Sequence, residues 1–196
     1  DWMDKGTLVM MHGMTGTAEM MRPFAEKILP KGWNLIVPQA QFNHPNRGFT
    51  WWRYEGEDNP GRRILSAKEL SDVDSSLLKL SKLLPDDDLV LGGFSQGGAM
   101  AQELLQFDLN ILGVIAIGTR AVRPLELKNR LQEIPARKLL WMHGESDHRV
   151  SLDAGLEIPE IFESSGWNVT RIEHHKGHMI PLEHHDSVAY WLKSLV

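Results

Sequence analysis

The chain has 196 residues, of which 42% are hydrophobic and 24% charged, with no cysteine and a formal net charge of −5. This length predicts one domain spanning residues 1–196, and the lack of cysteine excludes disulfides, thiolate nucleophiles and cysteine-ligated metal sites. The net negative charge does not favour binding to nucleic acid, and no apolar run is long enough to cross a bilayer. We therefore predict a soluble, cytoplasmic protein that neither binds nucleic acid nor inserts stably into membranes, and we leave a homodimer open.

Six short apolar runs predict the strands of a sheet. Each run is four to seven residues long, nearly continuous, and bounded by Gly, Pro, Asp or Asn. Continuous rather than alternating hydrophobicity is typical of parallel strands that are covered on both faces. The predicted strands are Thr7–Met11, Asn34–Val37, Leu89–Gly92, Ile111–Ile117, Lys138–Met142 and Val169–Glu173.

Helical patterns lie between these runs. The clearest covers Ser66–Leu84, where leucine and valine recur every three or four residues. Ser66 followed by Glu69 predicts a capping box, and Pro85 ends the helix. Weaker patterns predict helices over Ala18–Leu29, Gln96–Gln106, Asp153–Ser164 and Ser187–Leu195. The alternation predicts an α/β fold, a compact three-layer sandwich around a mostly parallel sheet of about six strands.

Two stretches do not follow this alternation. Gln39–Arg63 combines Pro, Gly, Asn, aromatic and charged residues, and we predict a long loop over the surface. Thr119–Arg137 lacks a strand pattern, and Leu125–Leu131 predicts one or two helical turns. Neither stretch is long enough for a large lid.

The sharpest chemical signal is the segment Gly93-Phe94-Ser95-Gln96-Gly97-Gly98, which follows a predicted strand and opens a predicted helix. This context is typical of a nucleophile elbow, in which small residues flank a serine on a tight strand-to-helix turn. Side chains two positions before and after the serine would collide, which explains Gly93 and Gly97. The alternative is a glycine-rich connection with an incidental serine.

A serine nucleophile needs a base and an acid that orients the base, and in this arrangement they follow the serine in the order acid, then histidine. Asp147 follows the strand Lys138–Met142, and His178 follows the next strand. We predict Asp147 as the acid and His178 as the base, with Glu145 and Asp153 as alternative acids.

Five histidines cluster near the carboxyl end of the chain, which raises the question of a metal site. No pair lies in an H-E-x-x-H motif or another recognised zinc-binding pattern, and adjacent histidines on a strand point to opposite faces. We predict no metal. The cluster consists of His174, His175, His178, His184 and His185.

Two backbone N–H groups are candidates for stabilising an oxyanion. Gln96 follows the serine at the start of a helix, where a positive dipole end favours negative charge. The loop after the first strand, from His12 to Thr17, contains two glycines that allow the backbone to turn inward. Its Met14 N–H is the predicted second donor.

These segments together resemble the phospholipase/carboxylesterase family of α/β-hydrolases, which includes acyl-protein thioesterases. The resemblance implies an α/β-hydrolase fold, a triad of Ser95, Asp147 and His178, and oxyanion donors at Met14 and Gln96. It also implies hydrolysis of carboxylic esters or thioesters without a cofactor. Members usually continue His-Gly-x-Gly-Asp after the first strand, whereas here the second glycine comes one residue later. The matching segments are His12-Gly13-Met14, Trp51-Trp52, Gly93-Phe94-Ser95-Gln96-Gly97-Gly98, His143-Gly144-Glu145-Ser146-Asp147 and Gly177-His178.

The predicted substrate is a small ester or thioester with a short to medium acyl chain. Two other functions are compatible with the same fold: a catalytically silent binding protein and a serine peptidase. For Trp51 and Trp52, contact with substrate and plain packing in the core are equally favoured. The residues expected to contact the substrate are Trp51, Trp52, Phe49, Met179 and Ile180.

Overall fold

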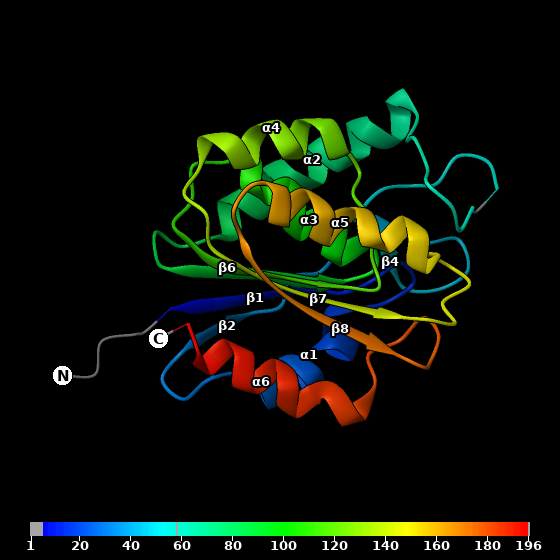
Figure 1. Ribbon diagram of the computed structural model, residues 1–196. Helices are drawn as coiled ribbons and strands as arrows, with labels where there is room; N and C mark the ends of the chain where they lie inside the picture. Colours follow the sequence, from blue (N-terminus) through cyan, green and yellow to red (C-terminus); the bar gives the residue numbers. More distant parts are fainter. Residues whose placement is uncertain (1–5, 58, 196) are drawn as a thin grey trace.

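The computed structural model of the protein describes residues 6–57 and 59–195. Its centre is a six-stranded sheet in the order β2-β1-β5-β6-β7-β8, with every neighbouring pair parallel (Figure 1). All six predicted strands are confirmed, with ends that shift by at most two residues. The strands are β1 (Thr7–Met11), β2 (Asn34–Ile36), β5 (Leu89–Phe94), β6 (Ile111–Ile117), β7 (Lys138–Gly144) and β8 (Asn168–His174).

Helices cover both faces of the sheet and form the outer layers of a three-layer sandwich (Figure 1). One face carries α1 (Ala18–Ile28) and α6 (His185–Lys193). The other face carries α2 (Ala67–Leu83), α3 (Gln96–Glu103), α4 (Pro124–Glu133) and α5 (Leu152–Ser164). A hydrophobic core lies on each side, so the central strands β1, β5, β6 and β7 are buried on both faces, while the edge strands β2 and β8 are partly exposed. The predicted fold class is confirmed.

The start of α2 shows how local sequence sets an element. The Ser66 hydroxyl accepts a hydrogen bond from the Glu69 N–H at 3.1 Å, and the Glu69 carboxylate accepts one from the Ser66 N–H at 3.1 Å. This reciprocal pair is the predicted capping box, and it satisfies two backbone donors at the helix end. Behind it, Val73, Leu77 and Leu80 are buried, so the apolar stripe faces the core.

The prediction of an open surface loop over Gln39–Arg63 is wrong in two respects. The segment contains an antiparallel hairpin, formed by β3 (Phe42–Asn43) and β4 (Phe49–Thr50). It then carries Trp51 and Trp52 into the core, where each is 2% exposed. Strands of two residues are too short to show alternation in the sequence, and the burial depends on contacts with distant elements.

The second irregular stretch is also more ordered than predicted. The helix α4 has ten residues, where one or two turns were expected over Leu125–Leu131. Pro124 lies in its first turn, where a missing backbone N–H costs nothing. Leu127 and Leu131 are its buried contacts with the core.

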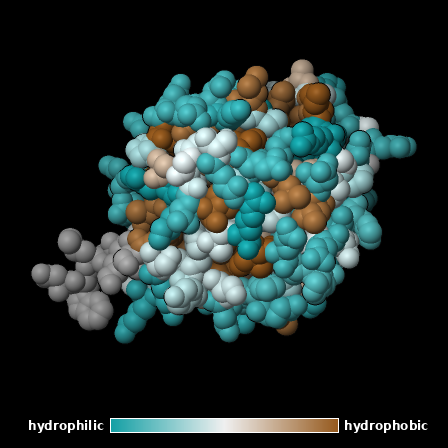
Figure 2. All heavy atoms as spheres, viewed as in Figure 1, coloured by the Kyte–Doolittle hydropathy of each residue, from teal (hydrophilic) through white to brown (hydrophobic). Residues whose placement is uncertain are grey.

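Apolar side chains form separate patches among polar ones on the face shown in Figure 2. Ile64 is 96% exposed, and Leu182 and Tyr190 are the next most exposed large apolar residues. Scattered exposure of this kind is ordinary for a folded domain. None of the helices within residues 6–57 and 59–195 combines the length and the apolar character needed to cross a membrane.

Candidate active site

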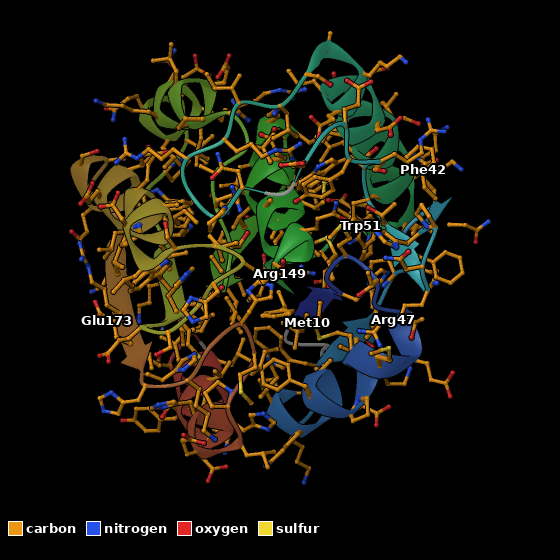
Figure 3. The ribbon with its side chains drawn as sticks, turned by 90° about the vertical axis from the view of Figure 1, so that its right-hand side faces the viewer. Met10, Phe42, Arg47, Trp51, Arg149 and Glu173 are labelled. Carbon is orange, nitrogen blue, oxygen red and sulfur yellow. The ribbon has the colours of Figure 1, made fainter. Side chains whose placement is uncertain are left out.

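The carboxyl ends of the parallel strands lie at one edge of the sheet, which faces the viewer in Figure 3. The strand register aligns the carboxyl ends of neighbouring strands: Met11 of β1 pairs with Gly93 of β5, and Phe94 of β5 pairs with Ile117 of β6. Loops that leave β1, β5, β7 and β8 therefore meet at this edge. Each predicted catalytic residue lies on one of these loops.

Ser95 connects β5 directly to α3 and has a backbone φ of 55°. This left-handed conformation is uncommon for a residue with a side chain, costs about 1–3 kcal/mol, and persists only where the surrounding structure holds it. Two hydrogen bonds do so: the Ser95 N–H donates to the Ile117 carbonyl at 2.9 Å, and the Thr119 hydroxyl donates to the Ser95 carbonyl at 2.6 Å. The turn therefore presents the serine hydroxyl at the edge of the sheet.

The glycines around Ser95 have different neighbours. A Cβ on Gly93 would lie 2.2 Å from the Gly97 carbonyl carbon, as the predicted collision requires. A Cβ on Gly97, however, would lie 2.1 Å from the Met11 carbonyl oxygen on the adjacent strand β1. Gly97 is thus needed for the close approach of α3 to β1, a constraint that the local sequence does not contain.

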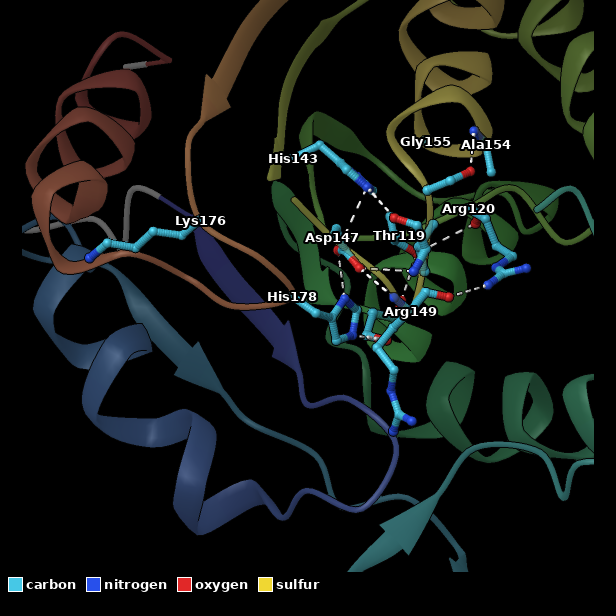
Figure 4. A network of polar contacts seen from close by, with 12 residues as sticks. Thr119, Arg120, His143, Asp147, Arg149, Ala154, Gly155, Lys176 and His178 are labelled. Carbon is cyan, nitrogen blue, oxygen red and sulfur yellow. Dashed lines mark hydrogen bonds and ion pairs between the residues drawn. The ribbon is translucent and has the colours of Figure 1, made fainter. Parts of the chain in front are cut away.

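Three side chains from separate loops form a chain of hydrogen bonds. The His178 Nε2 atom lies 3.0 Å from Ser95 Oγ, and His178 Nδ1 lies 2.7 Å from Asp147 Oδ2 (Figure 4). An ionised carboxylate only accepts, so His178 Nδ1–H donates to Asp147. The neutral ring then has a free lone pair at Nε2, which accepts the serine hydroxyl proton.

Asp147 is 5% exposed and is held by its own loop. Its Oδ1 atom accepts the backbone N–H groups of Arg149 and Val150, each at 2.9 Å. Burial raises the pKa of the Asp147 carboxyl, but the hydrogen bonds from His178 and the two backbone N–H groups outweigh it, and the net pKa is lowered. The carboxylate is therefore charged.

His143 supports this loop from the core side and had no assigned role in the sequence analysis. Its side chain is fully buried, and its Nε2–H donates to the Val150 carbonyl at 2.8 Å. Burial lowers the pKa of His143, so the ring is neutral. Its position as the first residue of the His143–Asp147 segment was the only signal in the sequence.

The alternative acids lie elsewhere. Glu145 is exposed, and its carboxylate lies 2.9 Å from His175 Nδ1. Asp153 is exposed in the first turn of α5. Of the three candidates, the structure brings only Asp147 to His178 within the part of the chain that it describes.

The adjacent His174 and His175 point in opposite directions, since His174 is 4% exposed and His175 is exposed, while the His174 ring lies 6.2 Å from that of His184. Among residues 6–57 and 59–195 there is no group of three or more His, Asp or Glu side chains placed to hold a metal ion.

The loop after β1 is fixed by His12. The His12 Nδ1–H donates to the Gly13 carbonyl at 2.7 Å, and Nε2 accepts the Ala40 N–H at 3.0 Å. Burial lowers the pKa of His12, partly offset by the hydrogen bond to Gly13, so the ring stays neutral and can make both contacts. The Met14 N–H follows directly on this fixed segment.

Thr15 occupies the position where the family pattern has glycine. Its φ of 69° keeps the left-handed conformation that glycine normally supplies. Hydrogen bonds to the hairpin hold it there: the Thr15 N–H donates to the Phe49 carbonyl at 2.9 Å, and the Phe49 N–H donates to the Gly16 carbonyl at 3.0 Å. The shifted glycine is thus accommodated by strain at Thr15.

Gln96 contributes more than its backbone. As the first residue of α3, its N–H lacks a carbonyl one turn earlier to accept it. Its buried side chain accepts the Trp51 N–H at 2.8 Å and the Thr50 hydroxyl at 3.0 Å, and donates to the Trp52 carbonyl at 3.1 Å. These bonds tie the end of the hairpin to the serine turn, which the sequence analysis did not foresee.

A cavity of about 250 Å³ opens beside the serine. Ser95, His178 and Met14 are in its wall, together with the aromatic rings of Phe94 and Tyr54. Phe94 also packs against the His178 ring, with centroids 4.7 Å apart. The arrangement suits attack by a serine on a small substrate, with base and acid already aligned.

A sequence profile described as Phospholipase/Carboxylesterase matches residues 3–195. The chain belongs to the phospholipase/carboxylesterase family. Another match is to acyl-protein thioesterase 1 of Neurospora crassa, 28% identical over 114 residues. That alignment covers 56% of this chain and 46% of the thioesterase, so the chain spans about half the length of this relative.

Solved structures with the same fold share little sequence with this member of the phospholipase/carboxylesterase family. Acyl-protein thioesterase 2 of Zea mays has a TM-score of 0.78 at 23% identity, covering 98% of this chain and 94% of that one. Esterase PE8 has a TM-score of 0.79 at 21% identity over the same shares of the two chains. The Bacillus cereus carboxylesterase has a TM-score of 0.75 at 18% identity, covering 98% and 89%. These structures show that the fold is that of the α/β-hydrolases.

The residues predicted to contact substrate lie outside the cavity wall in this member of the phospholipase/carboxylesterase family. Trp51 and Trp52 are buried, and the Trp51 Nε1–H donates to the His12 carbonyl at 2.8 Å, so they pack rather than line the cavity. Phe49 and Ile180 are half-buried against the two cores, and Met179 is exposed. None of the five is among the residues that line the cavity, so contact with substrate stays a prediction, and for Trp51 and Trp52 the structure shows the packing alternative.

Proposed function

We propose that the protein is a serine carboxylesterase that hydrolyses short- to medium-chain carboxylic esters or thioesters through an acyl-enzyme. The main support is the aligned hydrogen-bond chain from Ser95 Oγ to His178 at 3.0 Å and on to Asp147 at 2.7 Å. It begins at a strained serine turn of the kind found at nucleophile elbows. Family membership supports ester hydrolysis as the reaction class.

In the proposed reaction, Ser95 Oγ attacks the carbonyl carbon while His178 Nε2 takes the hydroxyl proton. Asp147 holds the imidazole orientation and stabilises its positive charge. The N–H groups of Met14 and Gln96 bind the oxyanion. The tetrahedral intermediate collapses as His178 returns the proton to the leaving alcohol or thiol, and a water then hydrolyses the acyl-serine by the same steps in reverse.

The volume of the cavity supports a small substrate. A volume of about 250 Å³ lies below the usual range for drug-sized ligands, which favours a short acyl group. Relatives named as a carboxylesterase and as acyl-protein thioesterases support both oxygen and sulfur esters as candidates. Faster hydrolysis of palmitoyl than of butyryl esters would contradict the proposed chain length.

Replacing Ser95 by Ala tests the proposal directly. We expect kcat for p-nitrophenyl butyrate to fall by about 10³-fold or more, because the nucleophile is lost and only binding remains. The matched control is Ser71→Ala, which removes an exposed serine from α2 and leaves kcat unchanged.

A fluorophosphonate probe followed by mass spectrometry gives the second measurement. Labelling of Ser95 in the wild-type protein, abolished in Ser95→Ala, supports the nucleophile. An unlabelled wild-type protein that hydrolyses none of the esters would instead favour the silent binding protein.

A further inference from the structure

The cavity beside Ser95 is rich in positive charge. Arg47, Arg120 and Arg149 are all in its wall, and no Asp or Glu is among the wall residues in the part of the chain that is described. The apolar and aromatic side chains in the wall are those of Met14, Tyr54, Phe94 and Val150. A wall of this composition is poorly suited to a hydrocarbon chain and well suited to an anionic group.

Arg120 is a buried residue of this charged wall. It is 8% exposed, and its guanidinium donates to the carbonyls of Asn59 at 2.9 Å, Gly61 at 2.7 Å and Arg149 at 2.9 Å. The last bond fixes the backbone of the loop that follows β7, from which the Arg149 side chain projects. Arg120 therefore positions the backbone of Arg149 and adds a buried positive charge to the same cavity wall.

Arg149 follows Asp147 by two residues, and its exposed side chain runs past His178 toward the loop after β1 (Figure 4). It is thus part of the same cavity wall as the proposed reacting side chains of Ser95 and His178. Arg120 and Arg149 also have other interactions within the protein, so replacing Arg47 changes the positive charge of the wall with the least disturbance elsewhere.

Arg47 reaches the cavity from the turn between β3 and β4, on the edge of the sheet that faces the viewer in Figure 3. The turn is closed by the His44 N–H, which donates to the Gly48 carbonyl at 2.9 Å. A Cβ on Gly48 would lie 2.2 Å from the Thr15 carbonyl oxygen, so the turn packs directly on the loop that carries Met14. The backbone at Arg47 is therefore fixed beside the loop that carries Met14, and its exposed side chain lines the cavity.

We infer that the physiological ester carries an anionic group, a carboxylate or a phosphate, close to its scissile bond, and that Arg47 and Arg149 bind this group. The inference rests on the proposed function and specifies its substrate class. A guanidinium fork matches the oxygens of either anion with paired, charge-assisted hydrogen bonds. The positive wall also concentrates anionic substrates at the site before they bind.

Esters with and without a charge test this inference. On the alcohol side, 4-acetoxybutanoate and 3-acetoxypropyl phosphate are compared with neutral butyl acetate; on the acyl side, ethyl hydrogen glutarate is compared with ethyl pentanoate. We expect wild-type kcat/KM to be about tenfold or more higher for at least one anionic ester than for its neutral counterpart. The two alcohol-side anions distinguish carboxylate from phosphate.

Arg47→Gln should lower the ratio of anionic to neutral kcat/KM by about tenfold or more, mainly through KM, because the fork is lost while the serine turn is untouched. Arg149→Gln should lower the same ratio. The control is Arg22→Gln, which removes an exposed arginine from α1 outside the cavity and leaves the ratio unchanged. Protection of Ser95 from fluorophosphonate by free glutarate, weaker in Arg47→Gln, gives a readout independent of turnover.

Equal rates for charged and neutral esters, or an equal loss for both in Arg47→Gln, would overturn the inference while Ser95 labelling still upheld the esterase. Absence of both hydrolysis and Ser95 labelling would overturn the proposed function and the inference with it.

Discussion

Asp147 accepts three hydrogen bonds, and together they set both its charge and its distance from His178. Two come from its own loop, through the N–H groups of Arg149 and Val150, and the third comes from the His178 ring. A local motif could identify Ser95 because the tight turn demands glycine at fixed spacing. The sequence predicted Asp147 as the acid but left Glu145 and Asp153 as alternatives, because that choice depends on which side chain turns inward.

Asp147→Asn should lower kcat for p-nitrophenyl butyrate by about 10³- to 10⁴-fold. An amide has only one oxygen, so it cannot accept from both the loop N–H groups and His178 Nδ1–H, and the ring is driven toward the wrong tautomer. Asp153→Asn is the matched control and leaves kcat unchanged. The reverse pattern, with Asp153→Asn inactive, would reassign the acid.

At the scale of elements, the turn between β5 and α3 is built against a third element, β1. Periodicity and capping residues predicted the strands and helices with small errors, since both signals lie within a few neighbouring residues. The hairpin β3–β4 was missed because two-residue strands show no pattern and their pairing depends on the loop after β1. The reason for Gly97 was likewise only partly visible, because Met11 lies on another strand.

Gly97→Ala should reduce the free energy of unfolding by about 3 kcal/mol, because its Cβ would lie 2.1 Å from a backbone oxygen that cannot rotate away. Urea denaturation followed by circular dichroism measures the loss. Gly61→Ala is the control, since its Cβ would meet only the Asn59 side-chain oxygen at 3.3 Å. Equal stability of the two variants would show that α3 can move away from β1.

At the scale of the molecule, buried ionisable side chains couple stability to pH in opposite directions. His12 and His143 are neutral in the folded protein because burial lowers the pKa of each ring. Burial raises the pKa of Glu103 to about 7, although Arg123 and Gln106 partly offset it. Below about pH 6.5 these histidines bind protons in the unfolded chain but not in the folded protein, so the free energy of unfolding falls as the pH is lowered. Glu103 acts the other way, and its contribution is lost as pH rises from about 4.5 to 7.

Comparing the wild type with Glu103→Gln isolates these effects. The variant lacks the Glu103 carboxyl, which opposes the effect of the buried histidines, so its free energy of unfolding should fall more steeply as the pH is lowered. Relative to the wild type, it should gain about 3 kcal/mol between pH 5 and pH 8. Urea titrations at pH 5, 6, 7 and 8, read by tryptophan fluorescence and circular dichroism, measure both trends. If the stability difference between wild type and Glu103→Gln did not change with pH, the raised pKa of Glu103 would be contradicted. The same titrations test the domain prediction: if residues 1–196 form one domain, the fluorescence and circular dichroism unfolding curves should coincide.

The sequence alone determined the strands, most helices, the capping box of α2 and the serine turn, because each depends on neighbours within a few residues. Tertiary structure decided that Ser95 meets His178, 83 residues away, and that Asp147 rather than a nearby carboxylate joins them. It also buried Trp51 and Trp52 and brought three arginines from separate loops into one cavity. These outcomes depend on how distant segments approach one another in space, and local periodicity carries no information about such distances.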